Sequence, residues 1–368
     1  MQLRFRALDI EKPDSRWQSL FGEYWPAYRA WFLKEGDGAR PGLGECREAL
    51  EAHMPELVPV WRELARLAGG DEVAARMLSL YRPPAYIFGC SQAVWSRDEP
   101  FLIRNYDYSP KLSEGVILRS NWNGTTLMGM NDCLWGLVDG MNEHGLALSL
   151  TYGGREASGD GFGIPLILRY ALERARTAEE AAEVLRKVPS HMAYNLIALD
   201  EEGRHLRIEL APDREALVSD EPVSTNHQAG PPNAEYAAQV RTVERSELLM
   251  RRLGDGAETA DAFIERFSRD PLFATGYERS FGTIYTAIYR PRARRVEYIW
   301  PGFICRQGLF AFREGEALIL YGDDAKLELG QQDWAWQAPA GTQAQDWQRL
   351  VPPEAGDWRK YLPGFLTE

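Results

Sequence analysis

Residues 85–95 read AYIFGCSQAVW, a β-rich stretch with a single Gly-Cys step in its middle. It follows the Arg-Pro-Pro at 82–84, where proline ends a helical pattern because it lacks a backbone N–H and restricts the residue before it. Upstream, residues 1–82 carry apolar side chains at three-to-four spacing and are predicted to be mainly helical. A strand-rich region is therefore expected to begin close to the Gly-Cys step.

Short strand patterns continue downstream of this step. The strand at 101–107 is expected to form a hairpin with the first one, Asn123-Gly124 predicts a second hairpin with a type I′ turn, and 142–145 predicts a third. Further strands are expected at 194–199, 205–210, 283–289, 296–300 and 317–321, and helices at 166–174, 177–185, 234–253 and 260–267. Alternating blocks of hairpin strands and helices predict an α+β layered fold with antiparallel sheets, not a parallel doubly wound sheet.

Composition narrows the class of protein. The 42 basic and 54 acidic residues give a net charge of −12, which argues against nucleic acid or an anionic membrane surface as a partner. The four cysteines are scattered without CxxC spacing, so we expect no thiol zinc site, no disulfide scaffold and a reducing, cytoplasmic location. No apolar run approaches the ~20 residues that span a bilayer. No histidine spacing or glycine loop predicts a metal or cofactor site.

The Gly-Cys step is the strongest candidate for chemistry. Glycine has no Cβ, so another group can approach the Gly89 carbonyl closely. If Cys90 Sγ attacked that carbonyl, an N→S acyl shift and hydrolysis would cut the chain and leave Cys90 with a free α-amine. An α-amine titrates at about 7.7–8.0 and would serve as a general base beside the thiol. The alternative is a buried structural cysteine in a strand.

Arg104 and Asp107 end the strand that is expected to pair with the cysteine strand. A carboxylate at Asp107 could orient the α-amine, and the guanidinium of Arg104 could hold a substrate carboxylate or carbonyl. Strand alternation puts positions 104 and 107 on opposite faces, so the pattern alone does not bring both to the thiol. The alternative is an ion pair at the surface, which contributes little to stability.

Two further segments carry candidate residues. Asn226, after a short strand, could donate its amide to a developing oxyanion, or could be an ordinary Asx-turn residue. His227 is assigned to the substrate-binding wall and is also a candidate base for a Cys–His pair, although a lone histidine is more often structural. The glycine-rich end of the third hairpin is expected to line a pocket, or is plain loop. It consists of Tyr152, Gly153, Gly154 and Arg155.

Five motifs in order are GCSQAVW, LIRNYDY, WGLVDGMNEHGLALSLTYGGR, MAYNLIALD and VSTNHQ. Together they resemble the N-terminal-nucleophile (Ntn) hydrolase superfamily, in particular the acyl-coenzyme A:6-aminopenicillanate (isopenicillin N) acyltransferase-like autoproteolytic cysteine hydrolases, over about residues 85–300. The chain resembles choloylglycine hydrolases and penicillin V acylases more distantly than it resembles that family. The resemblance implies a four-layer αββα sandwich and autocleavage between Gly89 and Cys90. It also implies that Arg104 and Asp107 match an R-N-x-D motif and that Asn226 helps to form the oxyanion hole.

The sequence departs from the choloylglycine pattern in three places. Gly154-Arg155 stands where those relatives carry an asparagine, and their second pocket arginine has no assigned counterpart here, with Arg279 named only as a guess. This chain also has 89 residues before its cysteine, whereas choloylglycine enzymes lack a long preceding segment. These departures argue against a bile-salt or penicillin V specialist. The predicted units are 1–89, a helical segment released or retained after cleavage, and 90–368, the catalytic domain with an irregular wrap from about 323.

The predicted activity is hydrolysis of a linear amide C–N bond through a Cys90 thioester in an autocatalytically matured zymogen. One alternative is acyl transfer between a coenzyme A thioester and an amine. Another is an uncut, non-catalytic binding protein of the same fold, and a third is an unprocessed thiol hydrolase that uses Cys90 and His227. The expected partners are a small amide or acyl substrate and the two cleaved chains for each other, with a homo-oligomer left open. No cofactor, metal, nucleic acid or membrane is expected.

Overall fold

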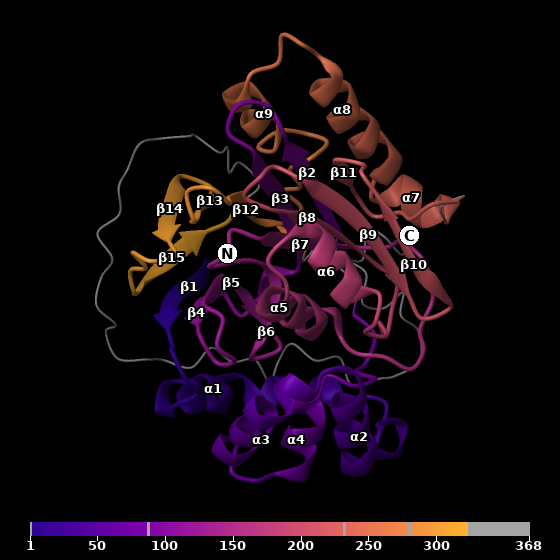
Figure 1. Cartoon of the computed structure of the whole chain (residues 1–368), viewed down its shortest axis with the longest axis vertical. Helices are drawn as coiled ribbons and strands as arrows, with labels where there is room; N and C mark the ends of the chain where they lie inside the picture. Colours follow the sequence, from indigo (N-terminus) through magenta and orange to yellow (C-terminus); the bar gives the residue numbers. More distant parts are fainter. Residues whose placement is uncertain (1, 87–88, 231–232, 278–280, 323–368) are drawn as a thin grey trace.

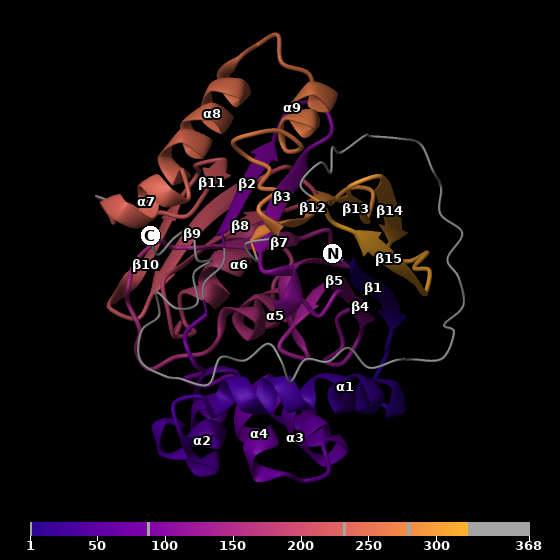
Figure 2. The same cartoon turned by 180° about the vertical axis from the view of Figure 1, so that it is seen from behind.

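The chain forms two β-sheets between layers of helices, with four further helices at one end (Figures 1 and 2). The structure is a computed structural model, and it describes residues 2–86, 89–230, 233–277 and 281–322. The predicted irregular wrap from about 323 and the candidate Arg279 lie outside the described residues. The expected α+β fold with αββα layers is confirmed.

The smaller sheet carries the Gly-Cys step and is antiparallel throughout. Its six strands run in the order β11-β2-β3-β12-β13-β14. They are β2 (Gly89–Trp95), β3 (Phe101–Tyr108), β11 (Val223–Ser224), β12 (Gly282–Arg290), β13 (Arg295–Trp300) and β14 (Phe303–Gly308). The sequence analysis did not predict β14.

The larger sheet has nine strands in the order β10-β9-β8-β7-β6-β5-β4-β1-β15. They are β1 (Gln2–Asp9), β4 (Val116–Ser120), β5 (Leu127–Asp132), β6 (Gly136–Asn142), β7 (Ala147–Tyr152), β8 (Tyr194–Leu199), β9 (His205–Ala211), β10 (Arg214–Ser219) and β15 (Gly315–Leu320). All neighbours are antiparallel except β1 and β4, which are parallel. The sequence analysis did not predict β10.

Helices cover the outer faces of both sheets. The larger sheet is covered by α5 (Ile164–Arg174) and α6 (Ala178–Leu185), and the smaller sheet by α8 (Thr242–Gly254) and α9 (Ala260–Arg266), with α7 (Ala234–Gln239) preceding α8. The N-terminal helices are α1 (Ser15–Phe32), α2 (Leu43–His53), α3 (Val58–Leu67) and α4 (Glu72–Leu78). Short 3-10 turns occur at Asp37–Ala39, Pro55–Leu57 and Pro110–Leu112.

Besides its helices, the N-terminal segment contributes β1, which the sequence analysis did not predict and which lies between β4 and β15 with Leu3, Phe5 and Ala7 buried. Two local expectations were wrong. The helix expected at 234–253 is broken at Arg241, whose φ of +52° lies in the left-handed region. The 123–124 turn is not type I′, since Gly124 has φ +90° but Asn123 does not share a positive φ; the loop from 121 to 126 is longer than a two-residue turn.

The alternation of side chains in β2 and β3 decides which groups meet at the Gly-Cys step. Even-numbered residues such as Cys90 and Val94 face the core between the sheets. Odd-numbered residues such as Ala93 and Trp95 face a second core under α8 and α9. Burial of apolar surface on both faces fixes this register, because a slip by one residue would exchange the two sets.

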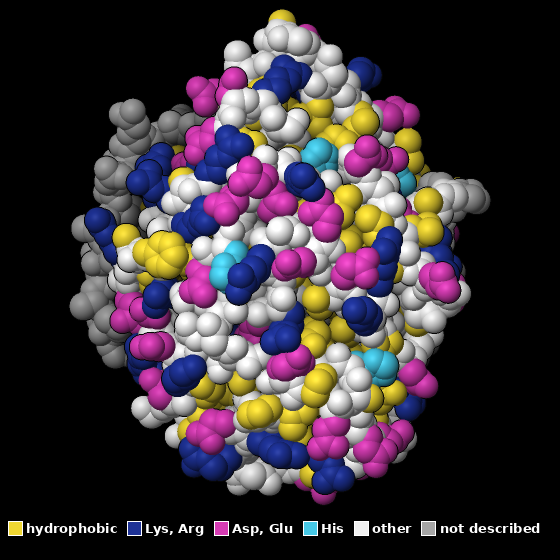
Figure 3. Space-filling view, viewed as in Figure 1, with side chains coloured by type: hydrophobic (Ala, Val, Ile, Leu, Met, Phe, Trp, Pro, Cys, Tyr) yellow, Lys and Arg dark blue, Asp and Glu magenta, His cyan; other side chains and the backbone are white. Residues whose placement is uncertain are grey.

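No helix in the described residues is long and apolar enough to cross a membrane. On the face shown in Figure 3, basic and acidic side chains are interspersed, and neither sign gathers into a large patch.

Candidate active site

Cys90 is the second residue of β2, and its side chain is fully buried. Its Sγ accepts a hydrogen bond from Nη2 of Arg104 at 3.2 Å, and its backbone N–H donates to Oδ1 of Asn226 at 3.0 Å. Burial raises the pKa of the thiol, while the Arg104 charge and a hydrogen bond from the Asp107 backbone act in the opposite direction. Sulfur and nitrogen of one residue are therefore each held by a different side chain.

Arg104 lies opposite Gln92 in the β2–β3 pair and is also fully buried. Besides Sγ, it donates through Nη1 to the Val138 carbonyl at 2.8 Å and to Oδ2 of Asp139 at 2.5 Å. Asp139 in turn accepts from the hydroxyls of Tyr285 and Tyr289, each at 2.5 Å. A buried charge needs such a partner, so Asp139 keeps Arg104 ionised beside the thiol.

Asp107 lies on the opposite face of the sheet, as the alternation predicted, and pairs in register with Gly89. Its Oδ1 accepts from Thr283 at 2.7 Å, and its Oδ2 lies 3.4 Å from Nη1 of Arg245. Burial raises the pKa of this carboxyl, although Arg245 and Thr283 lower it. Asp107 therefore approaches Cys90 from the helix side of the sheet, whereas Arg104 approaches from the core between the sheets.

Arg245, in α8, joins these groups, and the sequence analysis did not identify it. Its Nη1 donates to the Cys90 carbonyl at 2.9 Å and to Oγ of Ser91 at 2.7 Å, and its Nη2 donates to Oδ1 of Asn226 at 2.8 Å. It is 3% exposed and forms the ion pair with Asp107. Nothing in the local sequence distinguishes this arginine from others in an amphipathic helix. Asp139, by contrast, was visible as a charged residue inside an apolar strand pattern.

Gly89 is required for space. A Cβ at this position would lie 2.9 Å from Cζ of Phe281 and 3.3 Å from Cβ of Asp107. The first distance is shorter than real Cβ contacts allow, so a side chain here would displace the Phe281 ring. The absence of a Cβ thus permits close packing directly at the bond that precedes Cys90.

Tyr152, Gly153 and Gly154, which were predicted to line a pocket, lie beside the segment that carries Asn226. The Tyr152 carbonyl accepts from Nδ2 of Asn226 at 3.2 Å. Gly154 has φ +69°, and a Cβ there would lie 2.2 Å from the Asn226 carbonyl. Gly153 donates its N–H to the carbonyl of Ala193 at 2.8 Å. None of these three contacts reaches the thiol, but two of them bear directly on Asn226.

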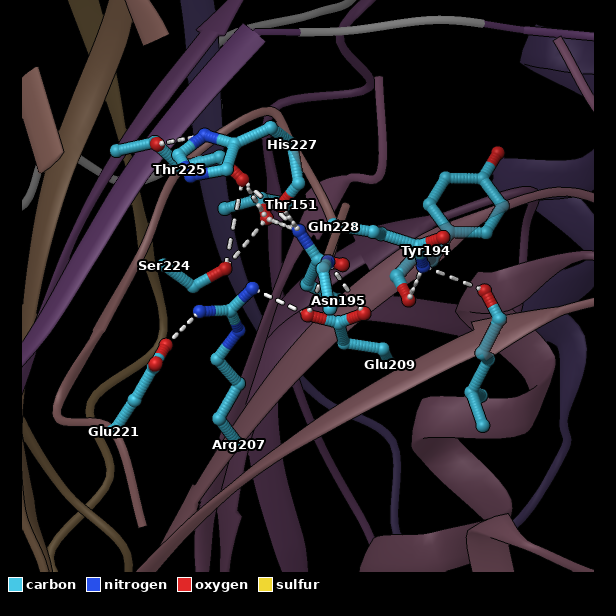
Figure 4. Close-up of polar contacts among 12 residues, drawn as sticks. Thr151, Tyr194, Asn195, Arg207, Glu209, Glu221, Ser224, Thr225, His227 and Gln228 are labelled. Carbon is cyan, nitrogen blue, oxygen red and sulfur yellow. Dashed lines mark hydrogen bonds and ion pairs between the residues drawn. The ribbon is translucent and has the colours of Figure 1, made fainter. Parts of the chain in front are cut away.

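Arg155 and His227 point elsewhere. Arg155 forms an ion pair with Asp213 at the surface. Nδ1 of His227 lies 2.9 Å from Oγ1 of Thr242 and 3.2 Å from Oγ1 of Thr225, as the polar network in Figure 4 shows in part. Burial lowers the pKa of this imidazole. The structure thus brings Cys90, Arg104, Asp107 and Asn226 together, but it does not bring His227 or the Arg155 side chain to the thiol.

The arrangement suits nucleophilic chemistry. A thiol beside a guanidinium, with an amide and a carboxylate on the other side of the same residue, matches the requirements for acyl transfer. Within the described ranges, no group of three or more histidine, cysteine, aspartate or glutamate side chains could hold a metal ion.

A second acidic group, made of the buried Glu114 and the half-buried Asp132, lies near the site between β5 and the N-terminal helix α1. The Tyr28 hydroxyl donates to Glu114 and lies 3.2 Å from Oδ1 of Asp132, which also accepts from the Cys133 N–H at 2.8 Å. Burial, reinforced by the charge of Glu114, raises the pKa of Asp132 to about 7, while Arg104 acts to lower it.

We expect this carboxyl to make stability fall as pH rises. The folded chain keeps the Asp132 proton up to about pH 7, whereas the unfolded chain releases it near the ordinary value of 3.8. The stabilisation is therefore complete below the unfolded pKa and is lost as pH rises through about 7, at about 1.4 kcal/mol per unit. Urea midpoints at pH 5 and pH 8 should differ more for the wild type than for Asp132→Asn. Parallel pH dependences would contradict this prediction.

Comparison with known proteins places these observations in context. Residues 95–304, more than half of the chain, match the profile of the acyl-coenzyme A:6-aminopenicillanic acid acyl-transferase family; the match begins after Cys90. No curated protein matches the sequence.

Three similar solved structures share only low sequence identity with this chain. A mutant of conjugated bile acid hydrolase from Clostridium perfringens is 13% identical, covering 66% of this chain and 100% of that one, with a TM-score of 0.43. Penicillin V acylase from Agrobacterium tumefaciens is 16% identical, covering 60% and 86%, with a TM-score of 0.41. The Caenorhabditis elegans ortholog of N-acylethanolamine-hydrolyzing acid amidase is 18% identical, covering 63% and 99%, with a TM-score of 0.39.

Proposed function

Since the chain belongs to the acyl-coenzyme A:6-aminopenicillanic acid acyl-transferase family, as its motifs predicted, we propose that it is an autoproteolytic Ntn cysteine hydrolase that cleaves a linear amide C–N bond. The observation that carries the proposal is the double anchoring of Cys90. Its Sγ is bound by Arg104 and its backbone nitrogen by Asn226, directly after a glycine that a side chain could not replace without displacing Phe281.

Maturation is the first step of the proposal. Cys90 Sγ attacks the Gly89 carbonyl carbon, the bond to the Cys90 nitrogen breaks, and the acyl group moves to sulfur. Water then hydrolyses this thioester, so that residue 89 gains a carboxylate and Cys90 gains a free thiol and a free α-amine. Arg104 stabilises the developing thiolate, and Arg245 fixes the Cys90 carbonyl during both events.

Substrate hydrolysis repeats this chemistry on a second amide. The α-amine takes the thiol proton, Sγ attacks the substrate carbonyl, and the leaving amine takes the proton from the α-ammonium. Nδ2 of Asn226 and backbone N–H groups stabilise the oxyanion. Asp107 orients the α-amine from the helix side, and water completes the cycle by hydrolysing the thioester. A coenzyme A thioester in place of the amide, with an amine in place of water, is the acyltransferase alternative that the family description favours.

The first test is the intact mass of the purified chain. Denaturing mass spectrometry should find fragments of 89 and 279 residues from the 368-residue chain, and N-terminal sequencing of the larger one should begin at Cys90. Under native conditions the two fragments should elute together, because β1 is hydrogen-bonded to both β4 and β15 and the Trp17 indole of α1 donates to the Leu134 carbonyl. We therefore expect the N-terminal fragment to be retained.

The alternatives give different results in the same experiment. An uncut chain without activity on N-acyl amino acids, penicillins or short peptides would support a non-catalytic binding protein. An uncut chain that hydrolyses amides and loses this activity in His227→Ala would support a Cys90–His227 thiol hydrolase. Adding an amine acceptor together with an acyl-coenzyme A thioester to the matured protein separates acyl transfer from hydrolysis.

A further inference from the structure

The segment that presents Asn226 has little regular structure of its own. It follows β11, which is only two residues long, and ends before α7. Yet Oδ1 of Asn226 must meet both the Cys90 N–H and Arg245, and its Nδ2 meets the Tyr152 carbonyl. A side chain with three such partners needs a backbone held within a few tenths of an ångström.

One side chain from the larger sheet holds that backbone on both sides of Asn226. Nδ2 of Asn195, in β8, donates to the carbonyl of Thr225 at 3.0 Å and to the carbonyl of His227 at 3.0 Å. In Figure 4 these contacts converge on the Asn195 amide, below Thr151 and His227. The two residues that flank Asn226 are thus tied to a single amide.

Thr151 reinforces this contact. It pairs with Asn195 across β7 and β8, and its Oγ1 lies 3.2 Å from Nδ2 of Asn195. The same hydroxyl donates to the Thr225 carbonyl at 2.8 Å. Both side chains are fully buried. The carbonyl of Thr225 therefore accepts from two side chains of one cross-strand pair.

This arrangement has a cost for the Asn195 side chain. Its Oδ1 is buried and has no hydrogen-bond partner among the described residues. An unsatisfied buried acceptor costs about 1–3 kcal/mol. Any stabilisation that the Asn195 amide contributes therefore comes from its NH2 group alone.

We propose that Asn195, assisted by Thr151, is the positioning residue for Asn226 in both maturation and substrate hydrolysis. This inference rests on the proposed function of the site. Neither side chain touches the thiol or the reacting carbonyl. They act by fixing the two peptide groups around Asn226, so that its amide oxygen stays on the Cys90 nitrogen.

Asn142 offers a matched control. It is another fully buried asparagine, and its Nδ2 also spans two carbonyls, those of Leu172 and Ala175, at 2.8 and 2.7 Å. These carbonyls belong to α5 and its end, away from Cys90. Asn195→Leu removes the side-chain donor to the His227 carbonyl and one of the two side-chain donors to the Thr225 carbonyl. Asn142→Leu removes the side-chain donor to two carbonyls and also the acceptor of the His144 and Leu146 N–H groups. The control should therefore lose at least as much stability as Asn195→Leu.

The experiment measures the rate at which the 279-residue fragment appears in the full chain. Asn195→Leu should slow this rate at least tenfold relative to Asn142→Leu under conditions where both are folded. Thr151→Val, which keeps the shape but removes the hydroxyl, should also slow cleavage, and Thr151→Ser, which keeps the hydroxyl, should restore it. These two conservative variants keep the test valid if Asn195→Leu does not fold.

A pH profile separates positioning from general destabilisation. In the cleaved protein, Oδ1 of Asn226 accepts from the α-ammonium and so favours its charged form. The ammonium in turn favours the thiolate beside it, so loss of this contact should move the pH dependence of Cys90 alkylation by iodoacetamide to higher pH in Asn195→Leu and not in Asn142→Leu. If the wild type is cleaved, equal cleavage rates and equal alkylation profiles in Asn195→Leu and Asn142→Leu would overturn this inference and leave the proposed function standing. A wild type that is never cut would overturn the proposed function and this inference with it.

Discussion

Replacing Cys90 by alanine is expected to leave one 368-residue chain that neither cuts itself nor hydrolyses any amide. The variant lacks the only atom that the mechanism allows to attack the Gly89 carbonyl, and without cleavage no α-amine forms. Fragment formation, followed by intact mass, and amide hydrolysis should therefore both fall below detection, a loss of several orders of magnitude. Cys90→Ser should retain slow cleavage at most, because a hydroxyl is a weaker nucleophile at neutral pH.

Cys46→Ala is the matched control for this prediction. Cys46 is also a fully buried free cysteine, but it lies in α2 and contacts the Arg76 carbonyl. Both replacements remove one sulfur from a packed interior, so their packing costs should be similar. Cleavage and activity should persist in Cys46→Ala. Amidase activity that survives in Cys90→Ala would reject the mechanism.

Replacing Arg245 by glutamine should reduce the cleavage rate at least a hundredfold. The change removes the donor shared by the Cys90 carbonyl, the Ser91 hydroxyl and Asn226, and it leaves the Asp107 carboxylate buried without its cation. A hundredfold loss corresponds to about 2.7 kcal/mol of transition-state stabilisation. Breaking a buried ion pair also costs about 3–5 kcal/mol of folding stability, so the rate must be measured on folded protein.

Arg169→Gln separates these two effects. Arg169 is fully buried and shares three of the four kinds of partner that Arg245 has: the carboxylate of Glu173, the carbonyl of Trp135 and the hydroxyl of Ser120. It lies in α5, on the outer face of the larger sheet. Thermal unfolding should show comparable destabilisation of both variants, while slow cleavage should occur in Arg245→Gln alone. Equally fast cleavage in both variants would remove Arg245 from the mechanism.

Local signals were sufficient to predict most of the layers. The strand expected at 194–199 coincides with β8, and the strands expected at 101–107 and 146–152 lie within one residue of β3 and β7. β1 was missed although Leu3, Phe5 and Ala7 alternate with arginines and polar residues, because it lies next to a helical block. No glycine or proline stands beside Arg241 to indicate that the helix breaks there. Helix propensity favours continuation there, and tertiary packing overrides it.

The sequence by itself was enough to determine the family, the layered α+β class and the nucleophile candidate with its preceding glycine, since motifs, strand alternation and turn residues act over a few neighbouring positions. Only the tertiary structure decided that Arg104 meets the sulfur while Asp107 lies on the other face. It also decided that Arg245, 155 residues from Cys90, completes the site. Such contacts depend on how α8 packs through Leu249 and its neighbours against the smaller sheet, and that packing results from burial of apolar surface distant in sequence from the polar groups that it brings together.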